Sequence, residues 1–410
     1  MPATLSVLTR YPDFRRLFIA ELMVFGGDWF VLVPLLVLLH DLTGGGLFGG
    51  LVLAADTGIN ALMLPFTGPV ADRVDRKKIM MTANLAAFAT VLLLFGVRSA
   101  GTAWLAPVAI AMFAVAKAFY TPAASAALPN LVAAEDLAAA NAITGSAWGT
   151  MAVVGASIGG VLSAAFNPYT SFYLTGAALL VAAGLAWRID RPLQTDRNGI
   201  VAARTWTAIR EGMRYIRHRP RVLALVTVKS AAGLGNGVLV IYPVLAIAYG
   251  AGPLGTGLLF AVRGLGALLG PLLFRRVLLH RGWLMPGLAI SMATYGVAYL
   301  GISTVRWFPL VLVLVVFAHV AGGGNWTMSN YALQAEVPDG LRGRVFATDI
   351  MVATLAISAS QLIVGGLVDT VSFRLLIAGC GATTLLYAIG WRIATTRRPA
   401  PAPVEGTPVT

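Results

Sequence analysis

The sequence contains few charged residues and almost no cysteine. Only 11% of its 410 residues are charged, whereas soluble domains average about 25%. A soluble chain of this length could not keep its surface hydrated with so few charges, so a soluble globular protein is excluded. The single cysteine, Cys380, lies in an apolar run and leaves no route to an internal disulfide or to a metal site built from cysteines.

Histidine is scarce as well. The four histidines lie in separate segments without metal-ligand spacing, and no nucleophile motif accompanies them; they are His40, His218, His280 and His319. We therefore expect no metal, no cofactor and no enzymatic activity.

Hydrophobic residues make up 58% of the chain and gather in long, continuous runs. Each run is close to the ~20 residues that a helix needs to cross ~30 Å of hydrocarbon, and helices satisfy their backbone groups internally. We predict an all-α membrane protein of twelve transmembrane helices. The expected spans are 17–39, 47–67, 79–97, 103–125, 139–165, 171–187, 222–246, 254–274, 283–303, 308–330, 345–366 and 371–392.

Lysine and arginine are distributed unevenly between the two sides of these spans. One side carries 24 of them, and the other carries only Arg98, Arg306 and Arg374. Because basic loops stay in the cytoplasm, we expect both termini to be cytoplasmic and the protein to lie in the inner membrane of a prokaryote. The same bias accounts for the net charge of +13, so we expect no nucleic-acid partner.

A weak internal repeat indicates two halves. Gly68-Pro69 and Gly270-Pro271 end corresponding spans 202 residues apart, and Leu128 and Leu333 repeat at an offset of 205. Duplicated halves are typical of transporters that rock around a central site. We predict two pseudo-symmetric six-helix bundles with a cavity between them. Their bounds are 1–188 and 222–396, joined by a cytoplasmic linker at 189–221 and followed by a disordered tail at 397–410.

The linker has its own pattern. Trp206, Ile209, Met213 and Ile216 recur at helical spacing. This predicts an amphipathic surface helix over Thr205 to Arg217, with a disordered linker as the alternative.

The connection after the second span carries the most specific motif. It begins Gly68-Pro69-Val70-Ala71-Asp72-Arg73 and ends Val74-Asp75-Arg76-Lys77-Lys78. This resembles the G-x-x-x-D-R-x-x-R-K/R signature of the major facilitator superfamily, and the span count and topology agree. The resemblance implies a transporter that works by alternating access, with Gly68, Asp72, Arg73, Arg76 and Lys77 in a gate.

Four shorter stretches resemble the twelve-span drug-efflux branch that includes macrolide-efflux and enterobactin-exporter-like proteins. They are Gly26-Gly27-Asp28, Tyr120-Thr121-Pro122-Ala123, Arg263-Gly264-Leu265-Gly266-Ala267 and Leu341-Arg342-Gly343-Arg344-Val345. The chain departs from that branch in two places. Lys117 stands near the position where drug antiporters often have an arginine, and the glycine-rich part of the fifth span lacks a proline. The motifs therefore leave proton coupling open.

Ionisable residues within spans are functional candidates, because each costs about 2.5–3.5 kcal/mol at a helix centre. We assign proton coupling to Asp28, Asp56, Lys117, Arg263 and His319. In this hypothesis Lys117 and Arg263 pair with acids of the first two spans across the interface between the halves. The alternative is a set of structural ion pairs and hydrogen bonds.

Three further charges have other expected roles. Glu21 is expected to pair with Arg15 or Arg16, and Lys229 is expected to snorkel toward the cytoplasmic surface. Asp349 is expected to meet the gate arginines in an outward-facing state.

The substrate surface should combine adaptable apolar walls with a few polar anchors. Candidates at suitable depth are Trp29, Asn60, Phe119, Tyr120, Trp148, Asn236, Tyr242, Asn325, Trp326 and Asn330. For each aromatic, lipid contact or helix packing is the alternative.

The sequence thus favours a monomeric secondary exporter of lipophilic or amphipathic small molecules, drug-like or siderophore-like, driven by proton antiport across the lipid bilayer. The alternative is a transporter of an endogenous lipid or metabolite, with or without coupling to an ion gradient. Export and import, and the identity of the substrate, are not separated by any motif.

Overall fold

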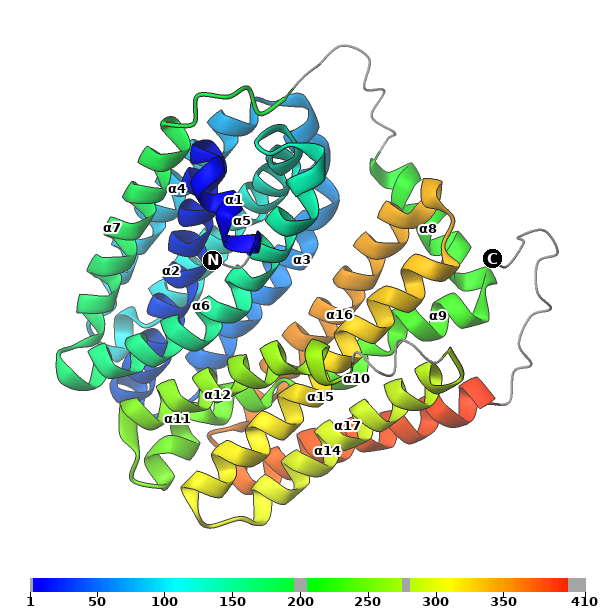
Figure 1. Cartoon of the computed structure of the whole chain (residues 1–410). Helices are drawn as coiled ribbons and strands as arrows, with labels where there is room; N and C mark the ends of the chain where they lie inside the picture. The colour runs from blue at the N-terminus through cyan, green and yellow to red at the C-terminus, as the bar shows by residue number, and fades with distance from the viewer. Residues whose placement is uncertain (1–2, 195–204, 275–280, 397–410) are drawn as a thin grey trace.

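The computed structural model describes residues 3–194, 205–274 and 281–396, and within these ranges it contains helices and no strand. Twelve helical segments are long and apolar enough to span a membrane. Figure 1 shows them arranged as two bundles. The predicted fold class is therefore confirmed.

The N-terminal bundle follows the short helix α1 (Ala3–Arg10). Its first long helix starts with a proline, whose missing N–H is harmless there, and ends at Gly44 in the left-handed conformation (φ 68°). The six helices are α2 (Pro12–Thr43), α3 (Leu47–Arg73), α4 (Arg76–Leu94), α5 (Leu105–Ala127), α6 (Leu137–Ala165) and α7 (Pro168–Trp187).

The C-terminal bundle begins with a span that is broken into α9 (Pro220–Thr227), α10 (Lys229–Gly235) and α11 (Val238–Ala248). At the second break the N–H of Gly237 donates to Ser360 Oγ at 2.9 Å, which replaces a lost helical bond. The other five spans are α12 (Gly252–Leu273), α14 (Leu284–Thr304), α15 (Phe308–Glu336), α16 (Asp339–Leu367) and α17 (Phe373–Thr396).

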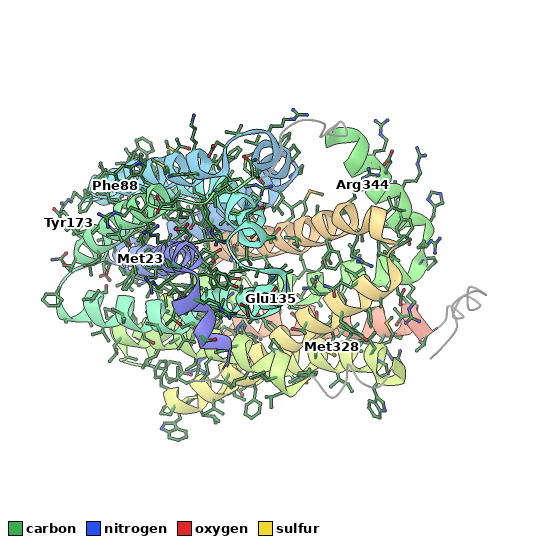
Figure 2. The ribbon with its side chains drawn as sticks, turned by 45° about the horizontal axis from the view of Figure 1, so that its top comes forward. Met23, Phe88, Glu135, Tyr173, Met328 and Arg344 are labelled. Carbon is green, nitrogen blue, oxygen red and sulfur yellow. The ribbon has the colours of Figure 1, made fainter. Side chains whose placement is uncertain are left out.

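Between the bundles, helix α8 (Thr205–His218) occupies the stretch for which we predict an amphipathic helix. It lies against α16, where Arg344 forms an ion pair with Glu211. Figure 2 shows Arg344 beside α8 at the edge of the molecule. Residues 195–204 of the linker and the tail at 397–410 lie outside the described residues.

Tryptophans mark the ends of several spans. Trp104, Trp187, Trp283 and Trp307 are all more than half exposed and lie at the beginning or end of helices. Tyr173 projects from the outer edge of the N-terminal bundle in Figure 2 and is equally exposed. Amphipathic rings prefer the boundary between lipid and water, so their placement agrees with twelve membrane-crossing helices.

The bundles meet along α3 with α16 and α6 with α12. We call the face with the connections at 74–75 and 337–338 the terminal face, and the face with the connections at 44–46 and 368–372 the opposite face. Toward the opposite face, a Cβ at Gly50 would lie 2.6 Å from Gly365 Cα. In Figure 1, α3 and α16 diverge toward the terminal face. The glycine contact therefore lies where the bundles are closed.

Candidate transport site

A buried lysine with two carboxylates lies inside the N-terminal bundle. Lys117 Nζ of α5 lies 2.9 Å from Asp28 Oδ2 of α2 and 3.0 Å from Asp56 Oδ1 of α3. We call these three residues the Lys117 triad. The side chains of Lys117 and Asp28 are each 11% exposed and that of Asp56 is 19% exposed. Three of the five predicted coupling residues are therefore brought together, but within one bundle rather than across the interface as we predicted for Lys117.

The triad has one positive charge and two groups that can carry a negative charge. It is neutral when one carboxylate holds a proton and carries one negative charge when neither does. Asp28 Oδ1 is buried and has no hydrogen-bond partner, so this oxygen offers a place for a proton. Two carboxylates that share one cation titrate as a unit rather than as independent groups.

The C-terminal bundle buries a different arrangement, which we call the Lys229 pair. Lys229 of α10 forms an ion pair with Asp349 of α16, and both side chains are completely buried. Lys229 Nζ also donates to Asn330 Oδ1 at 2.7 Å and lies 4.7 Å from the centre of the Trp326 ring. The predicted snorkelling of Lys229 is wrong, because its partners lie inside the bundle.

The gate residues contact backbone within the N-terminal bundle. Arg76 Nη1 donates to the carbonyls of Ala126 at 2.7 Å and Leu193 at 2.9 Å, and Lys77 donates to that of Ile189 at 2.9 Å. Arg73 is exposed. None of these bonds reaches Asp349, so the predicted gate contact stays a prediction for another conformation.

Two other gate predictions have different outcomes. A Cβ at Gly68 would meet no atom of the described residues within 4 Å, so none of the described helices packs closely against this gate glycine in this conformation. The side chain of Asp72 lies outside the described residues.

Glu21 does not make its predicted pair. Arg16 instead binds Asp13 at 2.6 Å and Asp190 at 2.9 Å, and Arg15 is exposed. Glu21 is only 7% exposed, and its Oε2 has no hydrogen-bond partner. The orientation of α2 about its own axis directs Glu21 into the bundle and away from the arginines at the start of the helix.

Aromatic residues of both bundles meet at one junction. The rings of Trp29 (α2) and Phe260 (α12) have their centres 5.9 Å apart, and Tyr242 (α11) meets Phe260 at 5.0 Å. The guanidinium carbon of Arg263 lies 5.6 Å from the centre of the Trp29 ring. We call these four residues the aromatic junction. Arg263 thus reaches the other bundle through an aromatic ring rather than through an acid.

His319 is tied to tyrosines within the C-terminal bundle. Its Nε2 lies 2.9 Å from the Tyr299 hydroxyl, which lies 2.8 Å from that of Tyr242. This chain of polar groups is buried. None of the hydrogen bonds among these three side chains reaches the Lys117 triad, which lies in the other bundle.

The remaining binding candidates are scattered. Tyr120 and Asn236 are buried with an oxygen that has no partner, and Asn60 and Phe119 are half-buried. Asn325 donates to Ser291 Oγ at 2.9 Å inside the C-terminal bundle. The side chain of Trp148 lies outside the described residues.

Sequence reasoning missed the polar contacts that close the opposite face. Asp369 Oδ1 accepts from the N–H of Gly46 at 2.7 Å, Gln361 Oε1 accepts from Thr57 Oγ1 at 2.9 Å, and Ser358 Oγ donates to a backbone carbonyl of α3 at 2.9 Å. Asp369 thereby caps the start of a helix from the other bundle. Polar residues recurring along the eleventh span were the available signal.

The structure also contains a cavity that we did not predict. Its volume is about 850 Å³, and it lies where α9, α15 and α17 meet in the C-terminal bundle. The ion pair of Arg221 with Glu336 forms part of its wall, beside Trp391. It contains none of the predicted binding residues, and the cavity expected between the bundles stays a prediction.

Comparison with known proteins identifies the family to which the chain belongs. The family model of the Major Facilitator Superfamily matches residues 17–285. The multidrug efflux pump Tap of Mycolicibacterium fortuitum is 26% identical over 88% of each chain, and the enterobactin exporter EntS of Salmonella typhi is 25% identical over 83% of this chain and 82% of its own. The crystal structure of the nucleoside transporter NupG superposes with a TM-score of 0.72 at 14% identity, covering 93% of this chain and 99% of that one. The chain belongs to the Major Facilitator Superfamily, as the motif at Gly68–Lys78 predicts.

Proposed function

We propose that this protein exports lipophilic or amphipathic small molecules by proton-coupled antiport. The Lys117 triad carries this proposal, because two carboxylates share one lysine in a nearly dry site. Membrane-embedded groups of this kind are costly and mark proton or substrate pathways. The names of the relatives Tap and EntS agree with export of drug-like or siderophore-like compounds.

In this mechanism a proton on the triad accompanies one of the two changes of the side to which the site opens, and the substrate accompanies the return. A proton on the triad leaves it neutral, and substrate binding favours the state that releases the proton. The two occupancies then favour different conformations, which couples the proton gradient to substrate movement. The junction residues Trp29, Tyr242 and Phe260 lie where the bundles meet and would line the path of the substrate.

We further propose an orientation with the terminal face in the cytoplasm, in the inner membrane, with the protein acting as a monomer. The contacts of α3 with Asp369 and Gln361 would then close the outer side. A cysteine placed at Arg76 should resist labelling from outside intact cells. Labelling from outside would contradict this orientation.

Transport into proteoliposomes with an imposed pH gradient tests the function. The panel would contain lipophilic cations, macrolides, aromatic acids and lysolipids. We expect at least one class to be concentrated only when the gradient is present. Equal uptake with and without the gradient, for every compound that moves, would contradict proton coupling and favour an uncoupled transporter of a lipid or metabolite.

A further inference from the structure

Arg263 differs from the other two cations within spans, because it has no acidic partner among the residues that the structure describes. Lys117 and Lys229 each contact a carboxylate within 4.0 Å, whereas Arg263 makes no such contact to any residue that the structure describes. Its Nε is buried without a hydrogen-bond partner. Guanidinium stays protonated in proteins, so Arg263 keeps a positive charge with which no described carboxylate forms an ion pair.

The position of this charge is at the boundary between the bundles. Arg263 is half-buried on α12, and the next residue, Gly264, packs so closely that a Cβ there would lie 3.0 Å from the backbone of Ala152 in α6. Gly160 and Gly257 bring the same two helices together nearer the opposite face, where a Cβ on either glycine would lie 2.7 Å from the facing Cα. A ligand held by Arg263 would therefore contact a helix of one bundle beside the other bundle.

One aromatic ring lies beside the charge, and a second ring packs against the first. The guanidinium lies over Trp29 at 5.6 Å from the ring centre, and Trp29 in turn meets Phe260 at 5.9 Å. Trp29 is held against α6, where a Cβ at Gly155 would lie 2.9 Å from the Trp29 Cβ. The junction therefore places a planar cation next to aromatic rings that are buried in this conformation.

We propose that Arg263 binds the acidic group of an amphipathic organic anion, whose aromatic part packs against Trp29 and Phe260 when the bundles separate at the junction. Guanidinium pairs with carboxylate or similar anions through two parallel hydrogen bonds, which gives geometric specificity as well as attraction. The same fixed charge would repel a lipophilic cation at this place. This inference rests on the proposed export function and names the substrate class for that site.

Binding of three matched probes to the purified full-length protein tests the inference without using transport. The probes are 2-naphthoate, its neutral amide 2-naphthamide, and the cation 2-naphthylmethylammonium, which share one ring system. Isothermal titration calorimetry at pH 7 should show naphthoate binding at least about tenfold more tightly than the amide, with the cation weakest. Equal affinities of acid and amide, or no binding of naphthoate, would overturn the proposal.

Substitutions test whether Arg263 is the source of the preference for naphthoate over its amide. Arg263→Gln should reduce the preference for naphthoate over the amide to within about twofold, and Arg263→Lys should keep a reduced preference because the charge remains. Arg98→Gln is the control, because Arg98 also lies over an aromatic ring, at 3.9 Å from Tyr169, but on an exposed connection. A preference unchanged in Arg263→Gln would overturn the proposal.

The outcome is separable from the proposed function. If Arg263→Gln does not yield folded protein, Arg263→Lys still decides, because a preference for the acid identical to that of the wild type would contradict the bidentate contact. Binding of the cation alone would overturn the anion assignment while proton-driven export, read by the gradient experiment, could still hold.

Discussion

The two bundles compensate the charge of a buried lysine in different ways. In the N-terminal bundle Lys117 contacts two carboxylates, and the three side chains keep between 11% and 19% exposure. In the C-terminal bundle Lys229 contacts one carboxylate, Asp349, and neither side chain is exposed. The Lys117 triad has one more acid than base and is partly accessible to solvent. The Lys229 pair has one acid and one base, and neither side chain is accessible to solvent.

We propose that this difference separates a site that exchanges a proton from one that stabilises helix packing. The Lys117 triad has two charge states that differ by one proton, and its exposure gives a proton a way in and out. The Lys229 pair is neutral as it stands, so any exchange would leave one buried charge uncompensated, which is strongly unfavourable. We therefore propose that the Lys117 triad couples transport to the proton gradient and that the Lys229 pair stabilises the C-terminal bundle.

The largest expected effect comes from breaking the Lys229 pair. Lys229→Met leaves Asp349 buried without its cation and should destabilise the protein by about 3–5 kcal/mol. Thermal unfolding in detergent, together with the yield of monodisperse protein, measures this loss. The double variant Lys229→Met/Asp349→Leu should recover most of it. A single variant as stable as the wild type would show that the pair is not structural.

Removing one acid of the triad should spare the fold and abolish coupling. Asp28→Asn leaves Lys117 with Asp56 alone, which makes the site resemble the balanced pair. Accumulation driven by a pH gradient should fall by roughly tenfold or more, while substrate binding and exchange without a gradient survive. If the variant still concentrates substrate as well as the wild type, Asp28 does not couple, and Asp56 or His319 would be tested next.

The second acid of the triad should matter less. Asp56 is more exposed than Asp28, and after its substitution the unpartnered Oδ1 of Asp28 is still present. Asp56→Asn should therefore reduce gradient-driven accumulation by about fivefold. The comparison of the two variants in the same proteoliposomes is the measurement. A larger loss than in Asp28→Asn would reverse the assigned order.

The smallest effect is expected at the surface of the terminal face. Asp136 accepts hydrogen bonds from Tyr11 and Arg10, each at 2.8 Å, and these bonds lower the pKa of its carboxyl group. Because the folded pKa is below the unfolded value of about 3.9, the stabilisation is complete above that pH and is lost as the pH falls through the folded pKa.

Asp136→Asn should accordingly lower Tm by at most about 2 °C near neutral pH, since exposed ion pairs contribute little. The difference from the wild type should shrink as the pH is lowered below about 3.9. A Tm difference that stays constant between neutral pH and about pH 3 would show that the carboxylate charge is not the cause.

The sequence predicted the spans well because hydrophobic length is a local property. Helices α2 and α15 run past their predicted ends, to Thr43 and Glu336, because the helix continues beyond the hydrocarbon. The break at Asn236–Gly237 was not predicted, since it depends on Ser360 of another helix to accept the free N–H. No pattern within the span itself indicates that contact.

The sequence indicates which charged residues within spans are functional candidates. It does not indicate which residues they contact. The acids of the triad were chosen because they are costly in hydrocarbon, but the sequence does not show which face each helix turns toward its neighbours. Lys229 and Glu21 lie near the basic rim in sequence, yet the rotation of α10 and α2 buries both. Helix rotation is set by packing across the whole bundle, which a single span does not encode.

The central claim is that the Lys117 triad, and not the Lys229 pair, exchanges a proton. Infrared difference spectra of the protein in nanodiscs, recorded between acidic and neutral pH, detect a protonated carboxyl group directly and need no substrate. We expect a carboxyl band in the wild type that disappears in Asp28→Asn, weakens in Asp56→Asn and persists in Lys229→Met/Asp349→Leu. A band that survives both triad substitutions, or that vanishes in the Lys229 double variant, would contradict the claim.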